Sequence, residues 1–237
     1  MYISIIFLPF LGALLSNRWN GYIYGPYLSL LTIFLSFIFS LIAFYEIGFL
    51  GSNVSIELGK WLEYGQWEIG WTFIFDTLTV SMLIPVITIS LLVQLYSINY
   101  MESDPHKIRF FSYLSIFSFF MLLLITGDNF LILFLGWEGV GLASYLLINF
   151  WFTRLAANFA ALKAFLINRI GDWGFMIGIL LIFSIIEDIS LSNLLVLGLY
   201  LNPDLTFLLL IFLLIGAMAK SAQFGLHTWL ADAMEGW

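Results

Sequence analysis

Residues 119–152 read FFMLLLITGDNFLILFLGWEGVGLASYLLINFWF, and this stretch decides the fold. One apolar run ends at Thr126, a Gly127-Asp128-Asn129 turn follows, and a second apolar run continues from Phe130 to Phe150. A helix that crosses a bilayer needs about 20 mostly apolar residues, so the pattern predicts two membrane helices joined by a tight turn. Glu138 lies near the middle of the second run. A charged group at that depth is costly, so it usually faces the interior of a helix bundle and marks an ion route.

The composition of the whole chain agrees with a membrane protein. Of its 237 residues, 62% are hydrophobic and 10% are charged, and the mean hydropathy is +1.03. Soluble domains carry about 25% charged residues, so a water-soluble globular fold is excluded. The net charge of −7 argues against nucleic acid as a partner. The chain has no cysteine, which excludes cysteine-ligated iron–sulfur clusters and thiolate zinc sites within it.

We predict an all-α polytopic membrane protein with about seven transmembrane helices. The first run is interpreted as a retained helix and not a cleaved signal peptide, because its only basic residue, Arg18, follows the apolar segment. The expected spans are residues 1–15, 27–50, 73–98, 110–126, 130–150, 158–186 and 205–230.

Residues 51–71 are too polar to span the bilayer. They are rich in tryptophan, with Trp61, Trp67 and Trp71 among them, and aromatic residues favour the membrane interface. We therefore expect an interfacial hairpin or short helix. Asp76, which opens the third span, is expected to cap that helix.

Basic residues in the loops predict the orientation. Seven spans place four of them on one side and Lys60 alone on the other. Cytoplasmic loops carry an excess of Lys and Arg, so the first set is expected on the cytoplasm-like side and the N-terminus on the opposite one. The first set is Arg18, Lys107, Arg109 and Arg154.

Glu138 and Lys220 are the leading candidates for chemistry. Each lies near mid-depth, and neither has an opposite charge within one turn of its own helix. Each therefore needs a partner on another helix, a change of protonation or a hydrated cavity. A lysine that moves to and from a carboxylate can load and release a proton. The competing interpretation is a static salt bridge that joins two helices.

Three further charges lie in the sixth span. Arg169 and Asp172 are spaced i,i+3 and can form an ion pair that allows the helix to insert. Lys163 can tune the site or extend to the nearby membrane surface. His227 can relay protons or can be an interfacial or capping residue. No residues have the spacing of a metal site.

The seventh span is expected to be discontinuous. Residues 216–225 read GAMAKSAQFG, which is weakly apolar for the middle of a membrane. Gly216, Ser221 and Gly225 tolerate a local unwinding that frees backbone groups. Interrupted helices beside a charge at mid-depth are a feature of transporters.

Four blocks of this sequence together resemble subunit 5 of NADH dehydrogenase in respiratory complex I. The resemblance covers essentially the whole chain. The blocks are residues 119–152 quoted above, YSINYMESDPHKIRFFSYLSIF (96–117), KAFLINRIGDWG (163–174) and LLIGAMAKSAQFGLHTWLADAMEG (213–236).

The resemblance implies the N-terminal part of an antiporter-like inverted-repeat fold. Residues 1–109 would be three N-terminal helices with the hairpin, and residues 110–237 would start the proton-translocating module. Glu138 matches the glutamate of helix five, and Lys220 matches the lysine of a broken helix seven. The other matched positions are Lys163, Arg169, Asp172 and the histidine His227.

The implied function is proton translocation in NADH:ubiquinone oxidoreductase, coupled to electron transfer from NADH to quinone. This chain would carry no redox chemistry and bind no cofactor, because FMN, iron–sulfur clusters and ubiquinone belong to other subunits. The expected location is the mitochondrial inner membrane, with a bacterial plasma membrane or a thylakoid less favoured. Alternatives are a subunit of a stand-alone cation/proton antiporter and a non-conducting scaffold.

The sequence departs from the family pattern in two places. Ala231 replaces a proline, and the chain stops at Gly236-Trp237, before the family's eighth helix. The expectation is one fragment of a split or truncated subunit, with the split favoured. The expected partners are other membrane-arm subunits of complex I and a second polypeptide that supplies helix eight onward.

Overall fold

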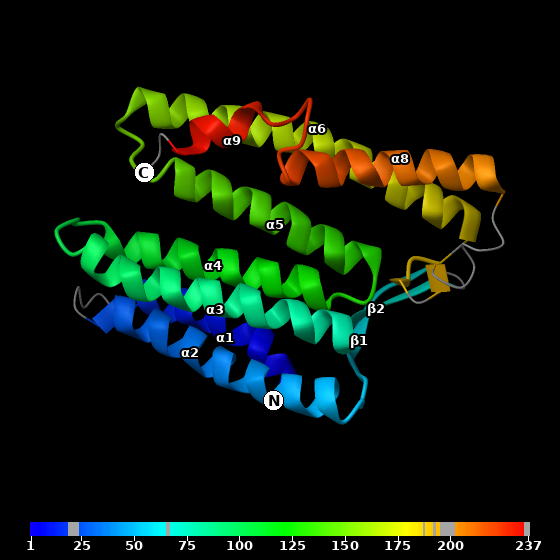
Figure 1. Cartoon of the computed structure of the whole chain (residues 1–237), viewed down its shortest axis with the longest axis horizontal. Coiled ribbons are helices and arrows are strands. Elements are labelled where there is room, and N and C mark those ends of the chain that lie inside the picture. Colours follow the sequence, from blue (N-terminus) through cyan, green and yellow to red (C-terminus); the bar gives the residue numbers. More distant parts are fainter. Residues whose placement is uncertain (19–23, 65–66, 187, 192, 195–201, 235–237) are drawn as a thin grey trace. The chain divides into compact units, whose positions relative to one another are not determined.

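The computed structural model describes residues 1–18, 24–64, 67–186, 188–191, 193–194 and 202–234 (Figure 1). The helices of the N-terminal half are α1 (Tyr2–Arg18), α2 (Tyr24–Phe44), the π-helix η1 (Tyr45–Phe49), α3 (Thr77–Tyr100) and α4 (Lys107–Thr126). The later helices are α5 (Phe130–Ile148), α6 (Leu155–Ile186), α8 (Pro203–Lys220) and α9 (Thr228–Ala233). Between η1 and α3 lie the strands β1 (Val54–Tyr64) and β2 (Trp67–Phe75).

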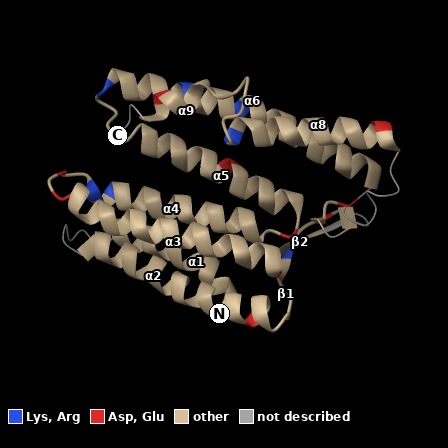
Figure 2. Ribbon diagram, viewed as in Figure 1, with Lys and Arg blue, Asp and Glu red and all other residues tan. Residues whose placement is uncertain are grey.

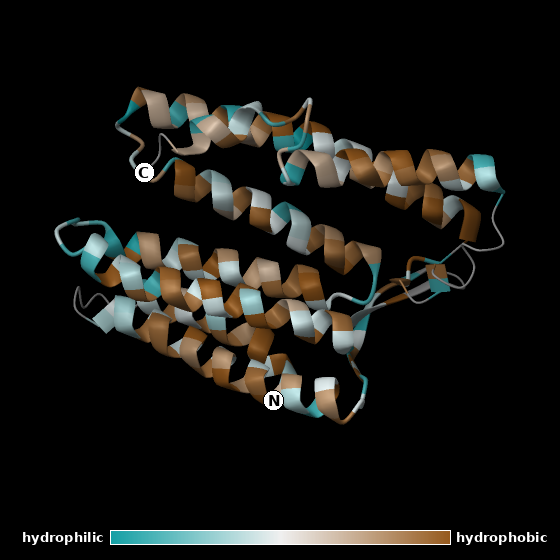
Figure 3. Cartoon of the chain, viewed as in Figure 1, coloured by the Kyte–Doolittle hydropathy of each residue, from teal (hydrophilic) through white to brown (hydrophobic). Residues whose placement is uncertain are grey.

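The predicted polytopic membrane fold is confirmed. Six helical segments are long and apolar enough to cross a membrane, and Tyr2–Asn17 forms a shorter apolar helix. Large apolar side chains on these helices are exposed, which lipid would accommodate. Figure 3 shows that hydrophobic residues occupy much of the length of the helices. Charged residues gather at helix ends and in loops, with few along the helices (Figure 2). The six segments are Tyr24–Phe49, Thr77–Tyr100, Lys107–Thr126, Phe130–Ile148, Leu155–Ile186 and Pro203–Lys220.

The segment predicted as an interfacial hairpin is a two-stranded sheet of β1 and β2. Within it, Trp61 stacks on Trp71 with ring centroids 4.7 Å apart, and Lys60 pairs with Glu63 at 3.7 Å. The expected start of the third helix at residue 73 is wrong, because β2 continues to Phe75. The side chains of Arg18 and Trp67, and residues Gly236-Trp237, lie outside the described part of the chain.

Asp76 caps α3, as predicted. Its carboxylate accepts a hydrogen bond from the Thr79 backbone N–H at 2.7 Å, and the Thr79 hydroxyl accepts one from the Asp76 N–H at 2.8 Å. This reciprocal arrangement satisfies two backbone donors that the first turn of a helix leaves free.

The described residues divide into two compact units. The first unit comprises Met1–Glu57, Thr72–Gly127 and Leu135–Ala143, and the second comprises Leu58–Trp71, Asp128–Phe134 and Ser144–Trp237. The sequence-based boundary at residue 109 stays a prediction.

Small and hydroxyl-bearing residues let the helices of the first unit approach one another. A side chain at Gly12 of α1 would collide with Thr32 of α2, 2.1 Å from its hydroxyl. The Thr32 hydroxyl donates to the Ser29 carbonyl of its own helix at 2.8 Å, and Ser36 donates to Ile33 at 2.7 Å. The buried hydroxyls are therefore satisfied without water, as a lipid environment requires.

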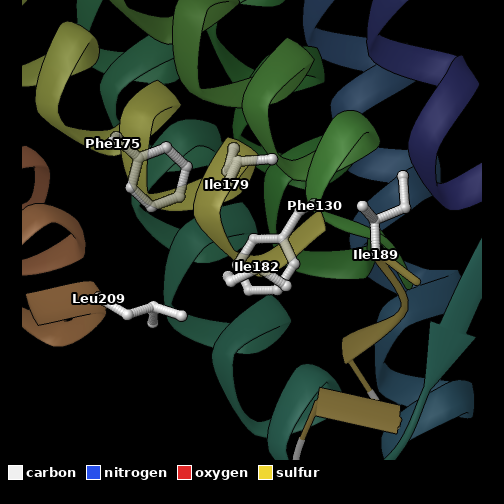
Figure 4. Packing of buried hydrophobic residues seen from close by; sticks show 6 residues of the cluster. All are labelled: Phe130, Phe175, Ile179, Ile182, Ile189 and Leu209. Atoms are coloured by element: carbon white, nitrogen blue, oxygen red, sulfur yellow. The ribbon is translucent and has the colours of Figure 1, made fainter. Parts of the chain in front are cut away.

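The second unit contains a core cluster in which α6 supplies three of the six members (Figure 4). The Phe175 ring of α6 stacks on Phe134 of α5, with centroids 6.2 Å apart. Leu209 brings α8 into the same cluster. The members are Phe130, Phe175, Ile179, Ile182, Ile189 and Leu209.

The start of α5 is fixed on two sides. Asn129 is 5% exposed, and its side-chain oxygen accepts from the Ile132 N–H at 2.9 Å while its amide donates to the Gly70 carbonyl of β2 at 3.0 Å. On the other side, the Phe130 N–H donates to the Ile189 carbonyl at 3.0 Å. The carboxylate of the neighbouring Asp188 also accepts hydrogen bonds. Burial raises its pKa, but hydrogen bonds from Asn193 and Ser190 outweigh this and hold the pKa below its usual value.

Replacing Asn129 by alanine is expected to lower the free energy of unfolding by about 1–2 kcal/mol, because the cap of α5 and its link to β2 are lost together. Unfolding in detergent measures the effect. The control is Asn202→Ala, which removes an exposed cap whose oxygen lies 3.4 Å from the Asp204 nitrogen. Equal losses in both variants would contradict the role of Asn129.

Candidate functional site

The predicted break in the seventh membrane helix is confirmed. That segment, expected as one span over 205–230, forms α8 up to Lys220 and the short helix α9 from Thr228. Between them the backbone turns at two residues with positive φ, Ala222 at 50° and Gly225 at 97°. Glycine adopts this conformation at no steric cost, whereas alanine does so with strain.

The carbonyl groups released at the break have new donors. Trp229 of α9 donates from its indole N–H to the Ala219 carbonyl at 3.0 Å. The Gln223 N–H donates to the Met218 carbonyl at 2.9 Å, whereas the Ala217 carbonyl keeps its helical donor, the Ser221 N–H, at 3.0 Å. Unsatisfied carbonyls are costly in lipid, so these contacts allow the helix to end inside a membrane protein.

Lys220, the last residue of α8, faces a carboxylate on α6. Its Nζ lies 3.9 Å from Asp172 Oδ1, and the two side chains are 18% and 5% exposed. At 3.9 Å this is a charge–charge contact and not a hydrogen bond. From the sequence alone, Lys220 needed a partner on another helix, a change of protonation or a hydrated cavity, and in the structure Asp172 on α6 is such a partner.

Glycine on α6 makes this contact possible. A side-chain carbon at Gly171 would lie 2.2 Å from the Cβ of Ala219, so the two helix backbones meet at this point. Gly171 precedes Asp172, and Ala219 precedes Lys220. The close approach therefore brings the carboxylate and the ammonium group opposite each other.

A second ion pair fixes α9 to α6. Lys163 Nζ lies 2.6 Å from Asp232 Oδ2, and the side chains are 42% and 46% exposed. We call Trp229 and Asp232 the α9 clamp, because one ties α9 to the end of α8 and the other ties it to α6. Asp232 was not predicted from the sequence. The only available signal was an acidic residue shortly after the expected break.

Two other predicted residues contact aromatic rings. The Arg169 guanidinium lies over the Phe165 ring at 4.9 Å, and its pairing with Asp172 stays a prediction. The exposed His227 stacks on Phe224 with centroids 6.3 Å apart. Its proposed part in a proton relay also stays a prediction.

Asn168 is a site residue that sequence reasoning missed. It is buried on α6 four residues before Asp172, so both side chains lie on the same face of the helix. Among the described residues, its side-chain oxygen has no hydrogen-bond donor. A buried amide in an apolar span was the signal that could have identified it.

Glu138 is half-buried in a tightly packed part of α5. A side-chain carbon at Gly136 would lie 2.7 Å from the Leu124 backbone of α4, and one at Gly139 would lie 2.1 Å from the Phe120 ring. Gly136 and Gly139 therefore allow α5 and α4 to approach closely. Glu138 belongs to the first unit and Lys220 to the second, and their pairing stays a prediction.

The chain resembles known proteins along most of its length. Residues 127–237 match a family described as "NADH:quinone oxidoreductase/Mrp antiporter, TM", and residues 61–111 match "NADH-Ubiquinone oxidoreductase (complex I), chain 5 N-terminus". NADH-ubiquinone oxidoreductase chain 5 of Rhizopus stolonifer is 51% identical over all of this chain, which covers 36% of that protein. A Neurospora crassa protein named probable intron-encoded endonuclease 4 is 47% identical over all of this chain, which covers 44% of it.

A solved structure shares the fold. It is a chain of the membrane-bound sulfane sulfur reductase, an archaeal respiratory membrane complex. The TM-score is 0.86 at 18% identity, and the match covers all of this chain and 48% of the other.

Membrane-spanning helices with an ion pair beside an interrupted helix define an antiporter-like membrane domain. The chain belongs to the NADH-ubiquinone oxidoreductase chain 5 family, and it spans about a third of the length of the chain 5 relatives that it matches.

Replacing Gly171 by alanine is expected to push α6 and α8 apart and separate Lys220 from Asp172, because no space exists for the added carbon. Small-to-large changes at packed sites cost about 1–3 kcal/mol. Thermal unfolding of the purified protein measures the loss. Gly48→Ala is the matched control, since its nearest neighbour would be 3.9 Å away. Unchanged stability of Gly171→Ala would contradict the close approach.

Asp232→Asn is expected to loosen α9 and increase protease cleavage between Lys220 and Thr228. An exposed ion pair contributes about 0.2–1 kcal/mol, so the increase should be no more than about fivefold. Exchanging the charges, with Lys163→Asp and Asp232→Lys in one chain, should restore protection. Failure of the exchanged pair to restore it would show that the contact does not hold α9.

Proposed function

We propose that this chain forms part of the proton-translocating membrane-arm subunit of NADH:ubiquinone oxidoreductase. That complex couples electron transfer from NADH to quinone to proton pumping. The observation that carries the proposal is the Lys220–Asp172 contact at the interrupted end of α8. It provides two titratable groups of opposite sign inside apolar helices, which is what a proton-transfer site in a membrane requires.

The physics of a buried ion pair explains how such a site can move a proton. Two opposite charges out of water stabilise each other, and removal of one partner is strongly destabilising because an uncompensated charge remains. If Lys220 moves away, the Asp172 carboxylate becomes neutral by taking up a proton. When Lys220 returns, the charged carboxylate is favoured again and the proton is released.

The interruption of the helix gives Lys220 freedom to move. Lys220 lies at the C-terminal end of α8, where the residues that follow leave the helical conformation. The α9 clamp limits that freedom on the far side of the break. The site therefore combines a charge at the interrupted end of one helix with a carboxylate on a continuous helix.

Neighbouring groups on α6 extend the site along the helix. The Asn168 side-chain oxygen can accept a hydrogen bond from a water molecule or from a protonated neighbour. Arg169 and Lys163 add positive charge to the same helix, and His227 lies near the start of α9. We propose that these residues tune the proton affinity of the site or relay protons to it. We further propose that Glu138 on α5 is a proton-loading group that pairs with Lys220.

The partners follow from the family. We propose that the chain assembles with other membrane-arm subunits of complex I in the mitochondrial inner membrane. We also propose that a second polypeptide supplies the segments that match the rest of the longer chain 5 relatives. FMN, iron–sulfur clusters and ubiquinone are held by other subunits of that assembly.

The function is tested with Glu138→Gln and Lys220→Gln, each introduced into the assembled complex in sealed vesicles. Each is expected to slow proton uptake at least about tenfold, equivalent to about 1.4 kcal/mol on a barrier. Lys220→Gln removes the positive charge beside Asp172, and Glu138→Gln removes a proposed proton-loading group. NADH oxidation by a soluble acceptor should be unchanged.

The matched control is Lys60→Gln, which removes a charge from the exposed hairpin. Normal proton uptake per electron in Glu138→Gln would remove Glu138 from the mechanism. Failure of the chain to co-purify with NADH-oxidising activity would overturn the assignment to complex I.

A further inference from the structure

A hollow in the first unit lies where three membrane helices begin or end. Its volume is about 240 Å³. About 15 Å³ is enough to hold one water molecule, so the hollow has room for a considerably larger polar group. The start of α2, the end of α3 and the start of α4 surround it. The lining residues are Pro26, Tyr27, Ile98, Asn99, Glu102 and Lys107.

Two opposite charges face this hollow without contacting each other. Within the described part of the chain, the side chains of Glu102 and Lys107 form no hydrogen bond or ion pair. Both side chains are therefore available to form charge-assisted hydrogen bonds with a bound group. The arrangement therefore favours a ligand that carries both signs of charge.

An apolar stripe leads away from the hollow along α2. Tyr27 lines the hollow and also begins a row of exposed side chains. The row continues with Leu31, Phe34 and Ile38, which share one face of the helix because they are spaced by three or four residues. A hydrocarbon chain along this stripe would reach the hollow at its polar end.

We propose that the hollow binds the headgroup of a phospholipid that carries a phosphate and an ammonium group. Lys107 would hold the phosphate as a point charge. Glu102 would hold the ammonium, and the Tyr27 ring would add a cation–π contact. Asn99 offers a further hydrogen-bond donor to the phosphate. One acyl chain would then lie along the stripe of Tyr27, Leu31, Phe34 and Ile38.

Other occupants fit less well. A purely anionic headgroup would satisfy Lys107 but would be repelled by Glu102. A small soluble zwitterion would leave the stripe of α2 uncovered. The combination of a two-charge hollow and an adjoining apolar row therefore points to an intact zwitterionic lipid.

The test measures lipid retention by the purified complex. The complex is exchanged into nanodiscs of phosphatidylethanolamine and phosphatidylglycerol in equal amounts, and bound lipid is counted by native mass spectrometry. Charge-assisted contacts of this kind change affinity about tenfold or more. Lys107→Gln should lower retention of phosphatidylethanolamine by about that factor, and Lys107→Arg should preserve it.

Glu102→Gln should shift the preference towards phosphatidylglycerol, because the repulsive charge is gone. Lys60→Gln, on the hairpin, should leave the retention of both lipids unchanged. Soluble phosphorylethanolamine should fail to displace the retained lipid, because it lacks the acyl chain.

The proposal is overturned if the unaltered complex retains both lipids equally, or if phosphorylethanolamine displaces the lipid. It is also overturned if folded Lys107→Gln, verified by thermal unfolding, retains as much phosphatidylethanolamine as the unaltered complex. If Lys107→Gln fails to fold, the lipid preference of the unaltered complex and the retention measured for Lys107→Arg still decide the test.

Discussion

The attraction between Lys220 and Asp172 constrains much of the second unit. A charged group inside apolar helices is tolerated only when an opposite charge or a polar cavity compensates for lost hydration. Here the compensation depends on backbone distance, because Asp172 is a short side chain on α6. Gly171 against Ala219 supplies that distance. The glycine at position 171 of α6 can be understood from this requirement.

The interruption of α8 needs support of its own. A helix that ends within a membrane protein exposes carbonyl groups that must find donors. Trp229 provides one of them from the far side of the break, and Asp232 anchors the same short helix to Lys163. The second unit thus has a continuous helix, α6, an interrupted helix, α8, and a short helix, α9, that contacts both of them. This is a suitable construction for a charge that moves over a short distance.

Much of this was predictable from the sequence. The spans follow from apolar length, the cap at Asp76 from its residue type, and the break near Lys220 from a weakly apolar, glycine-containing window. The partner of Lys220 was not predictable, because the sequence gives spacing along a helix but not which residues of two helices face each other. The sequence predicts a pair between Asp172 and Arg169 of the same helix, and that pair stays a prediction. Asp232 was missed because its contact with Lys163 exists only once the chain has turned at Ala222 and Gly225.

The central claim is that Lys220 and Asp172 act as one functional pair. A double-mutant cycle on proton uptake tests it most directly, with Lys220→Gln, Asp172→Asn and both together in the assembled complex. If the two residues act as a pair, Asp172→Asn should have a large effect alone and little further effect once Lys220 is already replaced. Independent effects that multiply in the double variant would contradict the account.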